Sequence, residues 1–438
     1  METKLWLGTS KIDITPQHSV PLAGFSLRSE DGGCKGITHP LYARIFYYRH
    51  MDGDGREMQA LLVSADLIWW GSERVPQLKL QIHEKWGIPE DSILLHGTHT
   101  HSGPQTSTQF SDLLGKADLR YIVELEALVL EGIGQAMADR EAVHVEFIRG
   151  RSDIGINRRK MVDGQCDFKA NPGGPHDSEV QLVRYRSLTG ETKALLVHFA
   201  CHPVANMENW VSSEFCGAAM DTIEQTLGGG VVSAYLQGCC GDINPAGADG
   251  ELILKGNDDE VTRIAKQFAG DVLGAMNGEW ERLEGCPLTA RIVTLSAPLQ
   301  NPPSAQELVK RMDEPGVIGE WSRKLLECPP RLQPQRPLDV VTLTLAEGLS
   351  VVAMNAEVVV EYGLYIKEAM KEACNGRVLP LGYTNGMIGY IPTAAQIGEG
   401  GYEAYWSTHY FLLPAPFSEE IEPMLRQAIR EIAECTNA

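Results

Sequence analysis

The sequence predicts a mixed α/β (α+β) fold in which central β-sheets of mixed strand direction are flanked by helices. Short apolar runs, typical of strands, alternate with longer segments whose apolar residues recur at three- and four-residue spacings, as in amphipathic helices. No internal repeat or low-complexity tract interrupts this alternation. With 43% hydrophobic and 22% charged residues in a chain of 438, a sizeable core can form and disorder is not expected.

Strands are expected wherever aliphatic, β-branched or aromatic residues cluster in a short run. In chain order these runs are 42–48, 59–68, 92–95, 143–148, 180–185, 194–199 and 231–236. Two later runs, 340–345 and 349–354, flank Ala346-Glu347-Gly348 and predict a hairpin with a short turn. Helices are expected where apolar residues share one helical face, over 119–137, 261–276 and 420–432.

We expect residues 1–438 to form a single domain, although a prior of roughly 150 residues per domain would allow two or three. The proline-rich segment from about 300 to 337 is where an insertion or subdomain is expected. The pattern gives neither the order of the strands nor the oligomeric state.

The net charge is strongly acidic, since 38 Lys and Arg residues stand against 58 Asp and Glu residues and leave −20. Nucleic acids and anionic membranes attract clusters of Lys and Arg, so neither is an expected partner. The N-terminus lacks the long apolar core of a signal peptide, and no apolar stretch is long enough to span a bilayer. The ten cysteines include no CxxC pair and are expected as reduced thiols. We therefore expect a soluble cytoplasmic protein.

The strongest local motif carries two histidines directly after an apolar strand, in Gly97-Thr98-His99-Thr100-His101-Ser102-Gly103-Pro104. In an extended chain, residues two apart project to the same side, so both imidazoles are expected to face one cavity. Neutral imidazole is a good zinc ligand. A surface turn that happens to be rich in histidine is the alternative for this motif alone.

A second pair of histidines, His198 and His202, follows another apolar run. The two side chains would share a face only if the backbone stays extended between them. A histidine that ends a buried strand is more often a hydrogen-bonded core residue than a metal ligand. Two strand ends that carry histidines nevertheless favour a shared site, because such ends converge at one edge of a sheet.

Three further stretches carry polar groups among apolar or glycine-rich residues. The turn from Gly238 to Pro245 contains Asp242 and Asn244, and its backbone N–H groups suit an oxyanion, although an Asx turn explains the same residues. Its adjacent cysteines, 239 and 240, are expected to pack in the interior, since neighbours in sequence do not easily chelate one ion. Glu357 lies inside an apolar run, and a buried acid needs a partner or a metal. Aromatic residues between 385 and 403 are, by default, packing residues.

Taken together and in this order, these motifs resemble the catalytic domain of the neutral/alkaline (non-lysosomal) ceramidase family. The similarity extends from residue 8 to about 405, through segments 8–16, 41–44, 97–104, 156–158, the stretch around His202, segment 241–245, Glu357 and segment 390–402. The resemblance implies one zinc ion per chain, with His99, His202, Glu357 and Tyr390 as its ligands. It also matches His101, Arg158 and Tyr402 to groups that polarise the substrate and handle protons.

The sequence departs from the family pattern at two points. The family carries Ser in the slot that Asn244 occupies here, often assigned as nucleophile or as a contact at the reaction centre. Asn cannot be acylated as Ser can, but its amide can hydrogen-bond a substrate or an oxyanion. Ceramidases also carry a further C-terminal β-rich domain, which does not fit into the residues that remain here. We therefore expect long-chain ceramide to be a poor substrate.

The function expected from these residues is that of a zinc-dependent hydrolase, an amidase that cleaves a C–N amide bond in a soluble small molecule. Zinc lowers the pKa of a bound water to about 7 and polarises a carbonyl, so a zinc-activated water is the expected nucleophile. His101 or Asp242 is expected to accept the water proton. Tyr402, Arg158 and Asn244 are expected to stabilise the oxyanion.

Three alternatives stay open at this point. The same metal site can act on an ester or on a sugar-derived amide. The chain can instead be a non-catalytic zinc-binding protein, in which protein groups close the fourth zinc position. A dinuclear hydrolase is also compatible with the sequence, with His96, His198 and Asp66 as ligands of a second metal.

Overall fold

The computed structural model describes residues 4–28, 32–53, 55–247 and 256–436. Its largest element is a 9-stranded sheet with the order β10-β9-β8-β5-β1-β2-β3-β4, to which β12 is added by pairing with β5. The strands are β1 (Lys4–Asp13), β2 (Tyr42–Met51), β3 (Glu57–Ala65), β4 (Ile93–Gly97), β5 (Glu141–Arg151), β8 (Glu179–Ser187), β9 (Thr192–Phe199), β10 (Val232–Gln237) and β12 (Glu281–Leu283). The sheet is mixed, because β3–β4 and β9–β10 are parallel pairs and the other neighbours are antiparallel.

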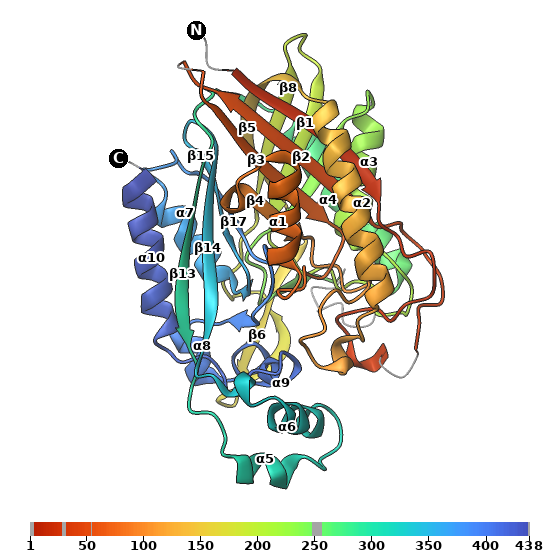
Figure 1. Ribbon diagram of the computed structural model, residues 1–438, viewed down its shortest axis with the longest axis vertical. Helices are drawn as coiled ribbons and strands as arrows, with labels where there is room; N and C mark the ends of the chain where they lie inside the picture. The colour runs from red at the N-terminus through yellow and green to blue at the C-terminus, as the bar shows by residue number, and fades with distance from the viewer. Residues whose placement is uncertain (1–3, 29–31, 54, 248–255, 437–438) are drawn as a thin grey trace.

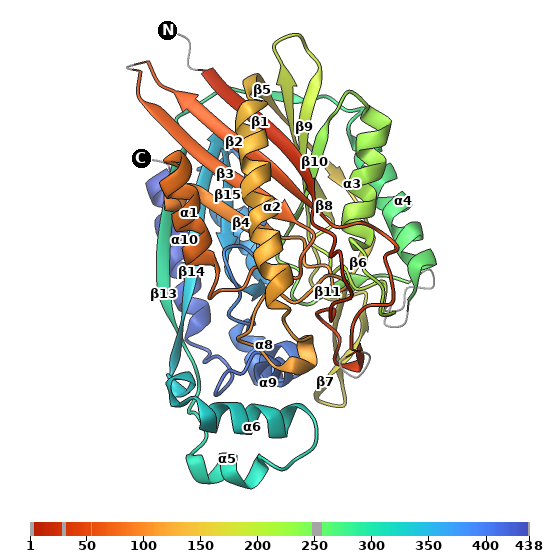
Figure 2. The ribbon, with the colours of Figure 1, turned by 45° about the vertical axis from the view of Figure 1, so that its right-hand side comes forward.

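Helices cover the outer face of this sheet. They are α1 (Val75–Trp86), α2 (Leu119–Ala138), α3 (Glu214–Leu227) and α4 (Asp258–Ala275). Figure 2 shows α2 lying across β1 and β2, and its buried residues Leu125, Val129 and Ile133 share one core cluster with residues of both β2 and β3. The three- and four-residue spacing of these side chains is what places them on one helical face.

A second sheet packs against the inner face of the first. Its 4-stranded order is β13-β14-β15-β17, from β13 (Thr289–Pro298), β14 (Gln335–Ala346), β15 (Leu349–Met354) and β17 (Arg377–Leu381). Buried residues from both sheets, such as Phe46 and Leu62 with Leu343 and Val351, form one cluster between them. On the far side of this second sheet lie α7 (Val360–Ala369) and α10 (Ile421–Thr436) (Figure 1).

Smaller elements gather at one end of the molecule and build the walls of the candidate site (Figure 1). They are the 3-stranded sheet of β11 (Ile243–Pro245), β6 (Gly155–Val162) and β7 (Gln165–Asn171), and the 2-stranded parallel sheet of β16 (Glu357–Val358) and β18 (Tyr390–Ile391). Three short helical elements follow, namely α8 (Ala394–Glu399), the π-helix η5 (Tyr402–Trp406) and α9 (Ser407–Tyr410). The remaining 3-10 turns are η1 (Ser26–Arg28), η2 (Glu90–Ser92), η3 (Asp112–Leu114) and η4 (Pro329–Leu332).

The helices α5 (Ala305–Arg311) and α6 (Val317–Glu327) lie at the edge of the molecule, within the segment expected to hold an insertion (Figure 1). They enclose a small cluster of their own, made of Leu308, Trp321, Leu325 and Leu412. Whether this segment is a separable unit stays a prediction, as does the single-domain organisation of residues 1–438.

The predicted mixed α/β class is confirmed, and each strand and helix expected from the apolar pattern overlaps an element of the same type. The expected hairpin corresponds to β14 and β15, which pair antiparallel around the turn at Glu347 and Gly348. The expected strand at 59–68 ends earlier, at Ala65. No helix among the described residues is long and apolar enough to cross a membrane. All ten cysteines are free.

Candidate metal centre and active site

His99 and His101 follow the end of β4, in the loop that continues this buried strand. The backbone N–H of His99 donates to the carbonyl of Leu67 at 2.8 Å, which fixes the loop beside the end of β3. His99 has a φ of 68°, in the left-handed region that non-glycine residues seldom adopt. The expected extended geometry for these two histidines is therefore wrong, because the chain kinks at His99. Residues held in such strained conformations cluster at functional sites.

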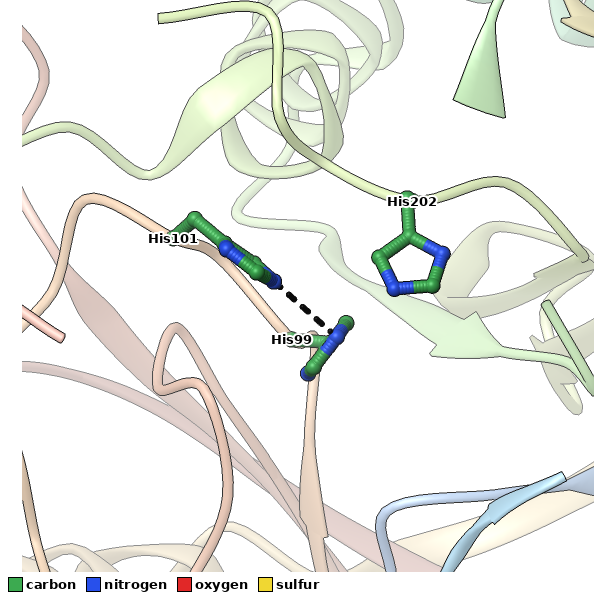
Figure 3. A group of neighbouring side chains, drawn as sticks. All are labelled: His99, His101 and His202. Carbon is green, nitrogen blue, oxygen red and sulfur yellow. Dashed lines mark hydrogen bonds between the residues drawn. The ribbon is translucent and has the colours of Figure 1, made fainter. Parts of the chain in front are cut away.

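The third histidine, His202, comes from the loop after β9. Its backbone N–H donates to the carbonyl of Ile243 at 2.9 Å. The ring nitrogens of His99, His101 and His202 lie within 4.8 Å of one another, and Figure 3 shows the three rings converging on one point. His198 does not join them, because its Nε2 lies 2.9 Å from the carbonyl of Pro380 in the core.

The backbone fixes the protonation pattern of two of these rings. The Nδ1 of His99 lies 2.9 Å from the carbonyl of Ile68, and the Nδ1 of His202 lies 2.6 Å from the carbonyl of Cys240. A ring nitrogen that faces a carbonyl oxygen carries the proton, so the Nε2 of each ring is left as a bare electron-pair donor. Metal-binding histidines are oriented in this way by their second nitrogen.

Glu357 brings a carboxylate to the same point. Its Oε2 lies 3.2 Å from the Nε2 of His99 and 3.4 Å from the Nε2 of His202. Both the Nε2 of His202 and the Oε2 of Glu357 are buried without a hydrogen-bond partner. Buried acceptors that face one another without a proton between them are costly, and a cation at their centre satisfies them together. The donor set therefore fits a metal ion.

The electrostatics of the cluster favour the forms that bind a metal. Burial and the nearby Arg158 lower the pKa of His202 to about 4, so its ring is neutral at neutral pH. Burial alone would raise the pKa of Glu357, but the adjacent His99 and His202 hold it well below its usual range. Neutral imidazole nitrogen and carboxylate oxygen are ligands that zinc prefers.

Two groups are placed to complete the donor set. Tyr390, which the family resemblance implies as the fourth ligand, is the direct partner of Glu357 in the sheet of β16 and β18. Its hydroxyl accepts a hydrogen bond from Nη2 of Arg158 at 3.1 Å. His101, expected as a catalytic group, has its Nε2 only 3.1 Å from the Nε2 of His99 and is thus also within reach of a metal. The identity of the fourth ligand stays a prediction.

A cavity of about 230 Å³ opens beside this cluster. Its polar lining includes His101, Arg158, Asn244, Tyr390 and Tyr402, so the structure gathers most of the expected site residues on one wall. The apolar lining consists of Phe25, Leu27, Leu114, Phe168 and Val204. The cavity thus combines an apolar lining with hydrogen-bonding groups, of which His101 belongs to the histidine cluster.

Of the residues expected to act in catalysis, Asp242 is the one that does not line the cavity. Its Oδ1 accepts from the backbone N–H of Val360 at 2.8 Å, and its Oδ2 accepts from Gln396 at 3.1 Å and Asn157 at 3.3 Å. Burial raises the pKa of this carboxyl to about 6. Because both oxygens are occupied in holding β11 against α7 and α8, its position does not support the expected role as proton acceptor.

The residues expected to bind a second metal form hydrogen bonds and an ion pair with other protein groups. The Nδ1 of His96 lies 2.9 Å from the hydroxyl of Thr384, and its Nε2 accepts from the backbone N–H of Gln237 at 2.8 Å. Asp66 accepts from Arg44 at 3.0 Å in a buried ion pair. Within the described part of the chain, the metal-competent group is that of His99, His101 and His202, so the dinuclear alternative loses its expected ligands.

Sequence reasoning missed two residues that hold the site together. Tyr383 stacks on His99, with ring centroids 4.0 Å apart and an interplanar angle of 25°. Glu403 is fully buried between Arg158 and Arg159 and accepts from both. Neither residue had a signal in the sequence, because Glu403 is preceded by the exposed Glu399 and its arginine partners lie far away in the chain.

Comparison with known proteins bears on the fold of the chain. No family model matches the chain. Over 260 residues it is 25% identical to neutral ceramidase A of Dictyostelium discoideum, a match that covers 55% of this chain and 35% of that protein, so the chain spans about a third of this relative. The crystal structure of neutral ceramidase from Pseudomonas aeruginosa superimposes with a TM-score of 0.78 at 18% identity, over 100% of this chain and 75% of that chain.

A structure of a ceramidase complexed with C2 gives the same TM-score of 0.78 at 18% identity, over 99% of this chain and 75% of that chain. Both alignments extend over essentially the whole of this chain, so the similarity concerns its overall fold. The resemblance drawn from the motifs is confirmed at the level of the fold: this chain folds as a neutral ceramidase-like catalytic domain.

Proposed function

We propose that this chain is a zinc-dependent hydrolase, an amidase that cleaves the C–N bond of a small, soluble N-acyl compound. The observation that carries the proposal is the pair of buried atoms without partners, the Nε2 of His202 and the Oε2 of Glu357, grouped with His101, which lines the cavity. The ceramidase-like fold supports the same reaction class, since a ceramidase acts on an N-acyl bond.

The residues that would hold the metal are His99, His202 and Glu357, with Tyr390 or His101 as a further ligand. Zinc in such a site lowers the pKa of a water ligand and polarises a substrate carbonyl. The chain supplies a rigid, dry frame for it, because the Nδ1 atoms of His99 and His202 are held by backbone carbonyls.

The protein groups that face the cavity divide into proton acceptors and hydrogen-bond donors. His101 is the candidate base, because it is the histidine that lines the cavity. Burial and the neighbouring His99 and His202 lower its pKa, so its ring is neutral and can accept a proton. Its Nδ1 is buried without a hydrogen-bond partner and faces Gly24, where a side chain's Cβ would come within 2.4 Å. Arg158 and Asn244 are the candidate donors to the oxyanion.

The cavity favours a short, uncharged acyl group. Its volume of about 230 Å³ lies below the range of roughly 300–1,000 Å³ that is common for pockets of drug-sized ligands. The cationic group in its lining, Arg158, is already paired with the buried Glu403, so a substrate carboxylate would compete with an existing ion pair. Long-chain ceramide is therefore a poor substrate in this proposal. A cytoplasmic location, expected from ten cysteines without a CxxC pair, belongs to the same proposal.

One observation favours a second candidate. The Nε2 of His101 lies 3.1 Å from the Nε2 of His99, so His101 can close the coordination shell and leave a zinc-binding protein without catalysis. One experiment distinguishes the two candidates. Zinc-loaded protein is assayed for turnover of short N-acyl amides, the matching esters and N-acyl sugars. Turnover of the amides that stops on chelation supports the amidase. Faster turnover of esters or sugar amides would reassign the substrate, and bound zinc without any turnover would favour the binding protein.

A further inference from the structure

Glu403 lies between two arginines from the neighbouring strand β6. Its Oε1 accepts from the Nε of Arg158 at 2.8 Å, and its Oε2 accepts from the Nη1 of Arg159 at 2.7 Å. Its side chain is only 1% exposed, and it belongs to the π-helix η5, directly after Tyr402 in the cavity wall. Single-turn π-helices occur frequently at functional sites.

Arg158 connects this ion pair with residues that line the cavity. Beyond Glu403, its Nη1 donates to the Oδ1 of Asn244 at 2.9 Å, and its Nη2 donates to the hydroxyl of Tyr390 at 3.1 Å. Each nitrogen of the planar guanidinium thus has an acceptor, which fixes the direction of the whole fork. Without the carboxylate at Nε, the guanidinium would keep the neutral acceptors of Asn244 and Tyr390 but lose its charged one, so its direction would be less tightly fixed.

The contact with Arg158 also fixes the orientation of the Asn244 amide. A guanidinium has donors and no acceptor, so the amide atom that faces it is the oxygen. The NH₂ group of Asn244 therefore points away from Arg158. Asn244 itself is held on β11 by pairing with Ile156 of β6, and it lines the cavity beside His101.

We propose that Glu403 is a positioning residue: through Arg158 it turns the side-chain amide of Asn244 so that its N–H groups face the cavity and bind the carbonyl oxygen of the substrate. This inference rests on the proposed function for the identity of that oxygen. It makes Asn244 a donor in the slot where the ceramidase family carries Ser, and it gives the buried acid of η5 a role in the reaction without contact to substrate.

The test compares Glu403→Gln with Glu399→Gln. Glu399 binds Arg159 at 3.1 Å and is 39% exposed, so its variant perturbs the same arginine pair without touching Arg158. On zinc-loaded protein and a short N-acyl amide, we expect Glu403→Gln to lower kcat by about 10- to 100-fold with less change in KM, since the lost donor acts on the oxyanion. Glu399→Gln should keep the wild-type rate, and both variants should keep their zinc.

Asn244→Asp tests whether the side-chain amide that Glu403 is proposed to position acts as a donor. This variant keeps the size of the side chain and its bond to Arg158 but removes the N–H donors. Loss of one such donor typically costs about 10²- to 10³-fold in kcat, which is the expected effect. If Glu403→Gln does not fold, this variant still tests the donor on which the proposal depends, because an unchanged kcat with zinc still bound would overturn the proposal.

A readout without turnover separates this inference from the proposed function. In protein labelled with ¹⁵N-asparagine, the side-chain NH₂ signal of Asn244 is identified by its loss in Asn244→Asp. Glu403→Gln should shift that signal, and Glu399→Gln should not. If the wild type cleaves no amide, the proposed function fails and the NH₂ signal alone decides whether Glu403 positions Asn244. An unshifted signal in Glu403→Gln, or zinc lost in proportion to the rate, would overturn the positioning role.

Discussion

Glu357 and Tyr390 stand directly opposite each other in the parallel sheet of β16 and β18. This pairing brings together a carboxylate and a phenol from two segments of the C-terminal part of the chain. The Oε2 of Glu357 lies 3.2 Å from the Nε2 of His99 and 3.4 Å from the Nε2 of His202. Through Glu357, this sheet of two residue pairs in the C-terminal part of the chain contacts the histidine loops after β4 and β9. The candidate metal centre therefore exists only in the folded protein.

Glu357→Gln tests the acidic ligand. The variant keeps the shape of the side chain but removes the charge that faces two imidazoles. Removing partners outside the ligand shell already costs about 10- to 100-fold in metal affinity, so we expect the zinc affinity to fall by more than about 100-fold. Competition with a chromogenic chelator measures it. Glu368→Gln, whose side chain is 78% exposed, is the matched control, and equal affinity in both variants would exclude Glu357 from the site.

His101→Asn tests whether His101 accepts a proton in the reaction or binds the metal. If His101 accepts the proton, kcat falls by about 10²- to 10⁴-fold and the zinc content stays unchanged. Its neutral ring, which burial and the nearby His99 and His202 secure by lowering its pKa, suits that role. Steady-state rates and elemental analysis of the same preparation check both quantities, with the exposed His83→Asn as control. A full rate with full zinc would remove His101 from the reaction.

Leu114→Ala tests the size limit of the cavity. Leu114 is buried in the cavity wall, and truncating it leaves room for additional methylene groups of an acyl chain. We expect the preferred acyl length to increase, at a cost in stability of about 2–5 kcal/mol. Relative kcat/KM across a series of N-acyl chain lengths measures the shift, and Leu119→Ala, at 64% exposure, should leave the preference unchanged. Efficient turnover of long-chain ceramide by the wild type would contradict the substrate proposal.

His198 makes the stability of the protein depend on pH. Burial and the nearby Lys367 lower its pKa to about 4, whereas an unfolded histidine titrates near 6.5. Between these values the unfolded state binds more protons, so this group destabilises the fold as the pH falls, by up to about 3 kcal/mol at about pH 4. Urea midpoints from pH 7 to pH 4.5 should drop less steeply in His198→Gln than in the wild type. Parallel slopes would refute this assignment.

The apolar patterns were sufficient for elements that are buried on both faces. Strands β9 and β10 are mostly apolar and lie between the sheet's covered faces, and such runs stand out in a sequence. Strand β1 was missed because Gly8, Thr9 and Ser10 interrupt its pattern, although the packing of α2 against it buries all of them. Helix α3 was missed for a similar reason, since its glycine, threonine and acidic residues blur the helical period.

The sequence predicted those site residues whose side chains can bind a metal and whose place in or after an apolar run is unusual for such side chains. His99, His202 and Glu357 follow or lie within apolar runs, which marks them as unusual. The kink at His99 was not accessible, because nothing in a histidine predicts a φ of 68°. Nor was the ion pair of Arg158 with Glu403, since two residues far apart in the chain meet only through the tertiary fold.

The zinc content of the purified protein tests the central claim most directly. We expect elemental analysis of protein made without added metal to find close to one zinc ion per chain. His99→Ala and His202→Ala should reduce it to near zero, because each removes a neutral nitrogen donor whose Nδ1 is already committed to the backbone. His198→Gln, a change at an equally buried histidine outside the cluster, should retain it. Zinc near zero in the wild type, or zinc unchanged in His99→Ala and His202→Ala, would contradict the account.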